Sequence, residues 1–289
     1  MRYAQLRAFH NVAIHGGFSR AAEALRLSQP AISDQVRRLE EEYDILLFDR
    51  SKRKVTITVK GAELLSITRK MFDQEQQARE FLSESSIQKS GTLKLFVDSA
   101  YHVTDLLSSF RRLAPRIDIS MRVGNSNDVT SALLSYEADI GVLGEVSSRK
   151  EFNMLRLGAS PLIAFAAKSS KFEDVVLGSY EDLLNYPLVM RESGSKTRQK
   201  LERAAQGAGV SLTPSIVTEG REAVREVVAS GIGIGFVSLA EFSPDPRLFQ
   251  IPLPEPCPVM EEVMVCLNDR RNQKVIKAFM KMATDQIRP

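Results

Sequence analysis

The sequence of 289 residues predicts an α + α/β fold with a small helical domain, a long linker helix and a larger domain. Residues 3–43 hold three short stretches with apolar residues at helical spacing. Residues 60–88 contain no proline and a single glycine, which favours one long helix. After residue 91, strand-like and helix-like runs alternate, which predicts parallel-sheet α/β architecture.

The composition is that of a soluble protein with two domains, because the length exceeds that of one average domain. Positive charge is concentrated at the start: residues 1–60 hold 11 Lys and Arg against 7 Asp and Glu, while the whole chain carries +3. This is a weak indication of nucleic-acid binding. We expect a cytoplasmic location, since the first residues do not resemble a signal peptide and no apolar run approaches the roughly 20 residues of a membrane span.

Residues typical of helix starts divide the first domain into three predicted helices. The first helix covers residues 3–15, and Ser19 is the expected N-cap of a second helix. Ser28 is the expected N-cap of a third helix, which runs to about Tyr43. Pro30 is compatible with this third helix because amides in a first turn have no partner within the helix.

The third helix has two different faces. One is apolar and is expected to pack on the first two helices: Ala31, Ile32, Val36 and Leu39. The other has the residue types that reach base edges in the major groove: Gln29, Pro30, Ser33, Asp34 and Arg37. An ordinary solvated helix face is the alternative. We favour DNA recognition because residues 46–57 follow as a β wing with a basic tip.

The long helix shows a short heptad pattern that predicts pairing with a second chain. Its a and d positions are Leu64, Met71, Ala78, Ile67, Gln74 and Phe81. The alternative is an amphipathic helix that packs only on its own domain.

The segments 18–25, 27–33, 36–40 and 47–50 together resemble the signature of LysR-type transcriptional regulators. This resemblance extends over the chain and implies a winged helix-turn-helix, a linker helix and a two-lobed effector domain similar to periplasmic binding proteins. The implied domains are 1–59, 60–89 and 90–289, the last with one lobe at 92–161 and 261–289 and another at 162–260.

The resemblance also implies partners and DNA-binding residues. We expect double-stranded operator DNA, a small effector, pairing through the linker helix and a tetramer, with RNA polymerase as a further candidate partner and no membrane. The implied DNA-binding residues are Ser28, Gln29, Pro30, Ser33, Asp34 and Arg37 in the recognition helix and Arg50 and Arg53 in the wing. Asp34 departs from the pattern, since many members have a basic residue there, and an acid repels phosphate.

Four segments are expected to line the effector cleft between the lobes. Their candidate residues are Asp98, Ser99, Tyr101, His102, Asn125, Ser126, Arg191, Ser193, Ser195, Thr197, Arg198, Arg221 and Glu222. The hydroxyls of residues 193–197 at a helix start predict an anion site, with an arginine adding a charged hydrogen bond. An ordinary capped loop with surface arginines is the alternative.

The effector prediction rests on a closer resemblance. Residues 1–9, 101–103, 124–126 and 221–226 look most similar to LysR-type regulators associated with aminoethylphosphonate catabolism. Such an effector is 2-aminoethylphosphonate or a related phosphonate, with Asp98 or Glu222 facing its ammonium group. Sulfur metabolites, amino acids and organic acids are the alternatives.

Catalysis, cofactors and metals are not expected. The glycines of residues 231–235 lack dinucleotide-binding spacing and indicate a turn into a buried strand. His102 assembles no catalytic set, and the two cysteines, Cys257 and Cys266, lack zinc-ligand spacing. The competing function is a small-molecule-binding protein or enzyme that carries a DNA-binding module.

Overall fold

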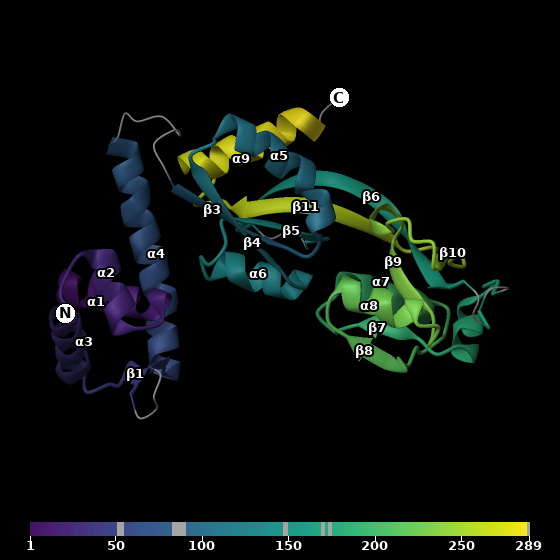
Figure 1. Cartoon of the computed structure of the whole chain (residues 1–289), viewed down its shortest axis with the longest axis horizontal. Coiled ribbons are helices and arrows are strands. Elements are labelled where there is room, and N and C mark those ends of the chain that lie inside the picture. The colour runs from purple at the N-terminus through teal and green to yellow at the C-terminus, as the bar shows by residue number, and fades with distance from the viewer. Residues whose placement is uncertain (51–54, 83–90, 147–149, 169–170, 173–174, 288–289) are drawn as a thin grey trace. The chain divides into compact units, whose positions relative to one another are not determined.

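The computed structural model describes residues 1–50, 55–82, 91–146, 150–168, 171–172 and 175–287. It contains two compact units, Met1–Glu84 and Ser85–Pro289. Figure 1 shows the elements of each unit. Among the helices of the described residues, none combines the length and apolar character that a membrane span requires.

The first unit is a winged helical domain followed by a long helix. Its elements are α1 (Tyr3–His15), α2 (Phe18–Leu25), α3 (Gln29–Tyr43), β1 (Phe48–Asp49), β2 (Thr56–Ile57) and α4 (Val59–Leu82). The three predicted helices and the antiparallel wing are confirmed. Arg53 and the basic tip at 51–54 lie outside the described residues.

Two details of the first unit differ from the sequence predictions. Helix α2 begins at Phe18, so its N-cap is Gly17, and the predicted cap at Ser19 is wrong. The helix begins earlier because the Phe18 ring packs on the core against Phe48, with ring centroids 5.8 Å apart. Ala31 is exposed and does not belong to the buried face of α3, which follows the i, i+4, i+7 stripe of Ile32, Val36 and Leu39.

Helix α4 packs part of its apolar surface on its own unit and leaves another part exposed. Leu64 and Met71 are partly buried against the core of the first unit. Thr68 is buried and its hydroxyl lies 3.0 Å from a ring nitrogen of His10 on α1. Next to this packed face, Ile67 and Phe81 are 65% and 90% exposed. Pairing with a second chain therefore stays a prediction, now restricted to the exposed side.

The second unit has two lobes, and the first is a sheet covered on both faces. Its elements are β3 (Gly91–Val97), η2 (Ala100–His102), α5 (Thr104–Leu113), β4 (Ile117–Val123), α6 (Ser126–Leu134), β5 (Ile140–Gly144) and α9 (Lys274–Ile287). Apolar side chains of α5 and α9 pack on one face of the sheet, and those of α6 pack on the other.

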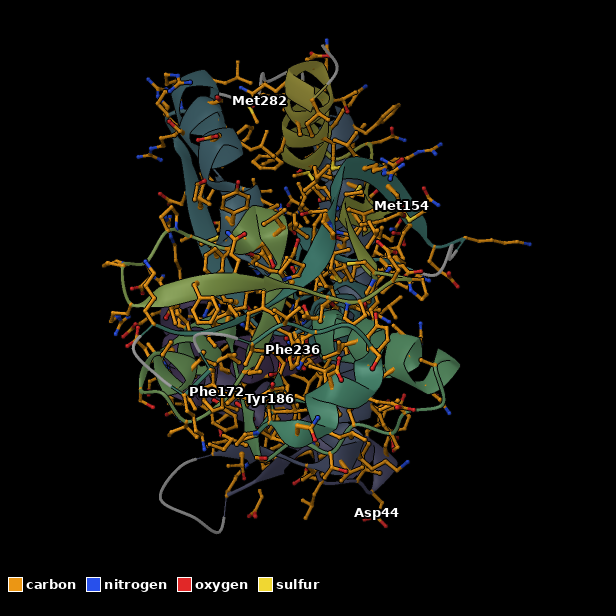
Figure 2. All side chains as sticks on the ribbon, turned by 90° about the vertical axis from the view of Figure 1, so that its right-hand side faces the viewer. Asp44, Met154, Phe172, Tyr186, Phe236 and Met282 are labelled. Carbon is orange, nitrogen blue, oxygen red and sulfur yellow. The ribbon has the colours of Figure 1, made fainter. Side chains whose placement is uncertain are left out.

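The second lobe likewise has strands with helices on both faces, but it is smaller. Its elements are η3 (Tyr180–Asn185), β7 (Val189–Arg191), α7 (Lys196–Gly207), β8 (Ile216–Thr218), α8 (Arg221–Ala229), β9 (Gly235–Ser238), η4 (Leu239–Glu241) and β10 (Leu248–Pro252). Phe172, Tyr186 and Phe236 belong to its larger core cluster (Figure 2). Strand β9 is fully buried, which confirms the strand predicted after the glycines at 231–235.

Two long strands, β6 (Phe152–Ala167) and β11 (Val259–Leu267), connect the lobes. They pair antiparallel with each other, and β11 pairs antiparallel with β5. The sheet order is β10-β6-β11-β5-β3-β4. Strands β4, β3 and β5 are parallel, as predicted, whereas β11 and β6 run antiparallel to their neighbours, so the sheet is mixed. The sequence analysis missed the first ten residues of β6, because they include Gly158 and Pro161, which are uncommon inside strands.

Candidate functional site

The exposed face of α3 carries the predicted recognition residues. Ser28 caps the helix and accepts a hydrogen bond from the Ala31 amide at 3.4 Å. Gln29 and Pro30 are exposed, and Ser33 and Asp34 are half-buried. The helix start and its short polar side chains are therefore accessible, as groove binding requires.

Asp34 has a role that its charge alone does not indicate. Its carboxylate contacts Arg37 Nη2 at 2.7 Å and Arg38 Nε at 2.8 Å. These guanidinium groups hold the pKa of Asp34 below its usual range. Arg37 also contacts Glu41 at 2.8 Å and stays 54% exposed. Asp34 therefore orients two arginines on the face that is predicted to meet DNA.

Glu40 was missed by the sequence analysis. Its side chain is buried beneath α3, where Oε1 accepts hydrogen bonds from the Leu47 and Phe48 amides at 2.8 and 3.1 Å. Its Oε2 contacts Arg50 Nη2 at 2.8 Å, and the Arg50 guanidinium lies 5.1 Å from the centre of the Phe18 ring. Glu40 thus fixes the start of the wing and one predicted DNA-binding side chain together. A carboxylate on the inner side of an amphipathic helix is the signal that identifies it.

A cavity of about 870 Å³ opens between the two lobes of the second unit. It is lined by these predicted effector residues: Asp98, Ser99, Tyr101, Asn125, Arg191, Thr197, Arg221 and Glu222. The structure does not place these other candidates in its wall: His102, Ser126, Ser193, Ser195 and Arg198. The cavity wall also includes Arg225 and the aromatic rings of Phe165 and Phe236, which the sequence analysis missed.

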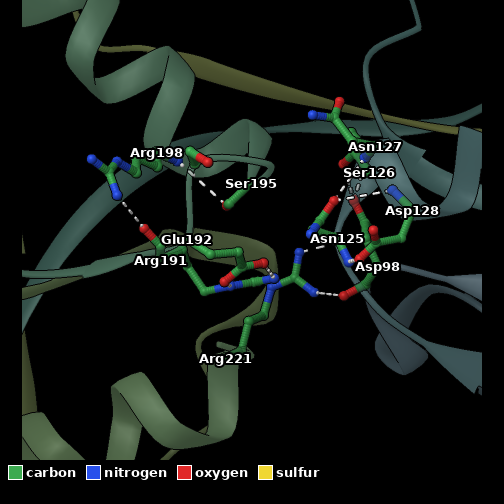
Figure 3. Close-up of polar contacts among 12 residues, drawn as sticks. Asp98, Asn125, Ser126, Asn127, Asp128, Arg191, Glu192, Ser195, Arg198 and Arg221 are labelled. Carbon is green, nitrogen blue, oxygen red and sulfur yellow. Dashed lines mark hydrogen bonds and ion pairs between the residues drawn. The ribbon is translucent and has the colours of Figure 1, made fainter. Parts of the chain in front are cut away.

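The arginines of the cavity wall each face a carboxylate. Arg191 is buried and donates to Glu192 at 2.9 and 2.7 Å. Although burial opposes ionisation, Arg191 holds the pKa of Glu192 below its usual range. Arg225 donates to Asp245 at 2.7 Å. Figure 3 shows the Arg191 and Arg221 side chains close to the residues of the first lobe.

At the start of α7, two residues of the predicted anion site make hydrogen bonds within the second lobe. Ser195 is buried and caps the helix by accepting from the Arg198 amide at 3.5 Å. Arg198 donates to the Arg191 carbonyl at 3.0 Å and to Glu202 at 2.7 Å. Thr197 is the residue of this turn that lines the cavity. Ser195 and Arg198 therefore shape the second-lobe wall without facing the cavity.

Asp98 supports the first-lobe wall of the cavity through two hydrogen bonds. Its Oδ2 accepts hydrogen bonds from the Ser126 hydroxyl and the Gly144 amide, both at 2.8 Å. Asn125 caps α6, and its side chain would lie 2.5 Å from a Cβ added to Gly194 of the other lobe. Glycine at position 194 therefore lets the two lobes approach each other at the cavity edge.

A buried ionic cluster lies next to this wall. Arg221 donates to the Asp98 carbonyl, and its Nε lies 2.9 Å from Glu241 Oε2. His102 Nε2 lies 3.0 Å from Glu241 Oε1 and 3.7 Å from Glu262 Oε1. Burial and the charges of Asp98 and Glu241 raise the pKa of Glu262 to about 9. His102, predicted for the effector cleft, lies instead in this cluster.

Comparison with known families agrees with both units. Residues 3–62 match the bacterial regulatory helix-turn-helix protein of the lysR family, and residues 86–288 match the LysR substrate binding domain. The chain belongs to the LysR family. Family membership makes it a DNA-binding transcriptional regulator with a helix-turn-helix unit and a substrate-binding unit.

Individual LysR relatives cover most of the chain. The HTH-type transcriptional activator CmpR of Synechocystis is 30% identical over 81% of this chain and 78% of its own length. A RuBisCO operon transcriptional regulator of Allochromatium vinosum is 32% identical over the same shares. HTH-type transcriptional regulator CysL of Bacillus subtilis is 27% identical over 82% of this chain and 81% of its own length.

Solved LysR structures share the fold. A full-length variant of OxyR from Pseudomonas aeruginosa matches with a TM-score of 0.77 and 20% identity, covering 100% of this chain and 95% of that chain. Full-length CbnR complexed with its target DNA matches with a TM-score of 0.67 and 17% identity, covering 99% of this chain and 100% of that chain. The predicted winged helix-turn-helix and two-lobed domain are thereby confirmed as the fold class.

Proposed function

We propose that this LysR regulator responds to a small effector that carries both an ammonium group and an acidic oxyanion group. The observation that carries the proposal is the mixed charge of the cavity wall. Three arginines line it: Arg191, Arg221 and Arg225. Six carboxylates line it as well: Asp98, Asp128, Glu192, Glu219, Glu222 and Glu241.

A purely anionic effector fits this wall less well than the sequence alone indicated. Each wall arginine already faces a carboxylate, so an anion has to compete with that partner for the guanidinium. An effector with an ammonium group compensates the released carboxylate. The Thr197 hydroxyl at the start of α7 adds a donor for the oxyanion.

2-Aminoethylphosphonate is the specific candidate, because it combines an ammonium group with a phosphonate. Amino acids have the same pair of charges with a carboxylate, whereas sulfate and organic acids lack the ammonium group. The subgroup resemblance supports the aminophosphonate, and the charge pattern supports the wider class. None of the relatives named above is named for phosphonate metabolism, so the aminophosphonate is supported by the subgroup resemblance alone.

A thermal-shift screen of the full chain tests this proposal. The panel contains 2-aminoethylphosphonate, amino acids, phosphate, sulfate and organic acids. A ligand at 100 times its dissociation constant should stabilise the native state by about 2.7 kcal/mol. Thr197→Val should weaken the response to the active ligand by about tenfold, since it removes one hydrogen bond. Thr284→Val on α9, outside the cavity wall, is the matched control.

The outcomes test the proposed class of effector and the specific compound, 2-aminoethylphosphonate, separately. A response to amino acids alone rejects the aminophosphonate but keeps the proposed class, an effector with both an ammonium group and an oxyanion group (a zwitterion). A response to sulfate or an organic acid alone rejects the zwitterion. Silence across the panel, or equal effects of both threonine variants, rejects the cavity as the site.

We further propose the roles of the DNA-binding face and the chain organisation. The residues of the α3 face read the major groove, and Arg50 with Arg53 contacts the flanking minor groove. The same proposal includes three domains, at 1–59, 60–89 and 90–289, with the lobes of the last at 92–161 plus 261–289 and at 162–260. It also includes the pairing of chains through α4 into dimers and tetramers.

A further inference from the structure

His102, Glu241 and Glu262 meet where the two lobes join. His102 ends η2 of the first lobe, Glu241 ends η4 of the second lobe, and Glu262 lies on the crossing strand β11. Their side chains are 10%, 1% and 4% exposed. One ligand atom from each side chain lies within 4.8 Å of the others. Three metal-ligating groups from distant parts of the sequence therefore point to one buried place.

The carboxylate of Glu262 lacks the partners that a buried acid requires. Neither of its oxygens has a hydrogen-bond partner among the described residues, although the side chain is almost fully buried. Oδ1 of Asp98, in the same cluster, is also buried without a hydrogen bond within the described part of the chain. Buried polar atoms are rarely left unpaired, because each one loses its hydration without compensation. The free oxygens of Glu262 indicate a missing positive partner.

The charge of the cluster points to a divalent partner. It contains three carboxylates, those of Asp98, Glu241 and Glu262, and one guanidinium, that of Arg221. Metal ligation requires ionised carboxylates and a neutral imidazole, and in that state these groups carry two uncompensated negative charges. A divalent cation compensates both, and buried charges are retained when they are paired or coordinate a metal.

We propose that His102 Nε2, Glu241 Oε1 and Glu262 Oε1 bind one divalent transition-metal ion of the zinc class. Two distances fit this ion: His102 Nε2 lies 3.0 Å from Glu241 Oε1 and 3.7 Å from Glu262 Oε1. Tetrahedral zinc with bonds of about 2.0 Å separates its ligand atoms by about 3.3 Å, between these two values. One imidazole and two carboxylates are a donor set that suits zinc or cobalt better than magnesium or calcium.

The proposed metal site adjoins the proposed effector site. His102 and Glu262 do not line the cavity, and Glu241 is the residue shared by both. The metal would tie η2, η4 and β11 together, and thus fix the junction of the lobes. The proposal does not depend on the identity or existence of an effector.

Metal titration of the full chain without an affinity tag tests the site. The probe is Co²⁺, followed by its visible absorption, with displacement by Zn²⁺. We expect saturation at about one equivalent per chain, and X-ray absorption of the zinc-loaded chain should show imidazole and oxygen ligands without sulfur. Loss of a group that only supports a metal ligand typically weakens binding by roughly 10–100-fold, so His102→Gln and Glu262→Gln, which remove the ligands themselves, should weaken it by about 100-fold or more.

Two variants control for metal bound elsewhere. Glu261→Gln changes the exposed neighbour on the same strand, and His15→Gln changes an exposed histidine of the first unit. Both should bind Co²⁺ as the unmodified chain does. Absence of a saturable visible band, an absorption spectrum without imidazole, or equal affinity in all four variants would overturn the proposal. The spectroscopic readouts on the unmodified chain decide the question even if a variant fails to fold.

Discussion

At the residue scale, buried carboxylates organise this molecule more than its exposed charges do. Glu40 accepts from two backbone amides and holds Arg50, whereas Asp34 is partly exposed and only orients its neighbours. Asp98 supports the cavity wall in the same way, through the Ser126 hydroxyl and the Gly144 amide. Glu40 and Asp98 each join segments that are separate in the sequence, so replacing either one should disturb several segments of the fold at once.

We predict that Glu40→Ala destabilises the first unit by about 3 kcal/mol, because it leaves the buried Leu47 and Phe48 amides without an acceptor. The measurement is urea unfolding of the full chain, with amide exchange used to follow Met1–Glu84. Glu41→Ala is the matched control, since Glu41 is its exposed neighbour and should cost about 0.5 kcal/mol or less. Equal losses in both variants would show that Glu40 has no special role.

At the scale of single elements, α4 has two sides with different tasks. One side packs on α1 through Leu64, Thr68 and Met71. The adjacent side leaves Ile67 and Phe81 exposed to solvent, which is unusual for large apolar side chains that share one side of a helix. The d positions of the predicted heptads thus remain available for a second chain.

We expect Ile67→Glu and Phe81→Glu to weaken chain pairing by roughly 100-fold, about 3 kcal/mol, because each places an unpaired charge in an apolar interface. Sedimentation equilibrium of the full chain measures the effect. Ser66→Glu, at an exposed position beside Ile67, should leave the association unchanged. If both substitutions left the association constant as it is, α4 would not be the pairing element.

At the scale of the whole molecule, a regulator must couple its two binding sites. The cavity lies between lobes joined by β6 and β11, so a ligand that contacts both lobes favours one arrangement of them. Coupling free energy acts equally in both directions.

We therefore predict that the active effector changes operator affinity by a factor of about 5–150, and that operator DNA changes effector affinity by the same factor. Calorimetry with each ligand, in the presence and absence of the other, measures both factors. Arg37→Ala should weaken DNA binding and keep the effector affinity of the free chain. A factor of one in both titrations would mean that the cavity ligand does not regulate DNA binding.

Local signals in the sequence determined the elements whose causes lie within a few residues. Periodicity and helix-start signals predicted the three helices of the first unit, α1, α2 and α3. The same signals predicted the Ser28 cap of α3, and the family signature predicted the fold class. These features depend on backbone geometry and side chains that are close in the chain, so a sequence displays them directly.

Only the tertiary structure decided which charged groups meet. His102 and Glu241 are 139 positions apart, and no local pattern links them to each other or to Glu262. The antiparallel course of β11 and the packing of η4 against β6 bring these groups together. Packing of distant segments also removed Ser195 and Arg198 from the cavity wall and placed Arg225 there. The physical reason is that burial and pairing of charges depend on contacts between segments, which residue order specifies only through the completed fold.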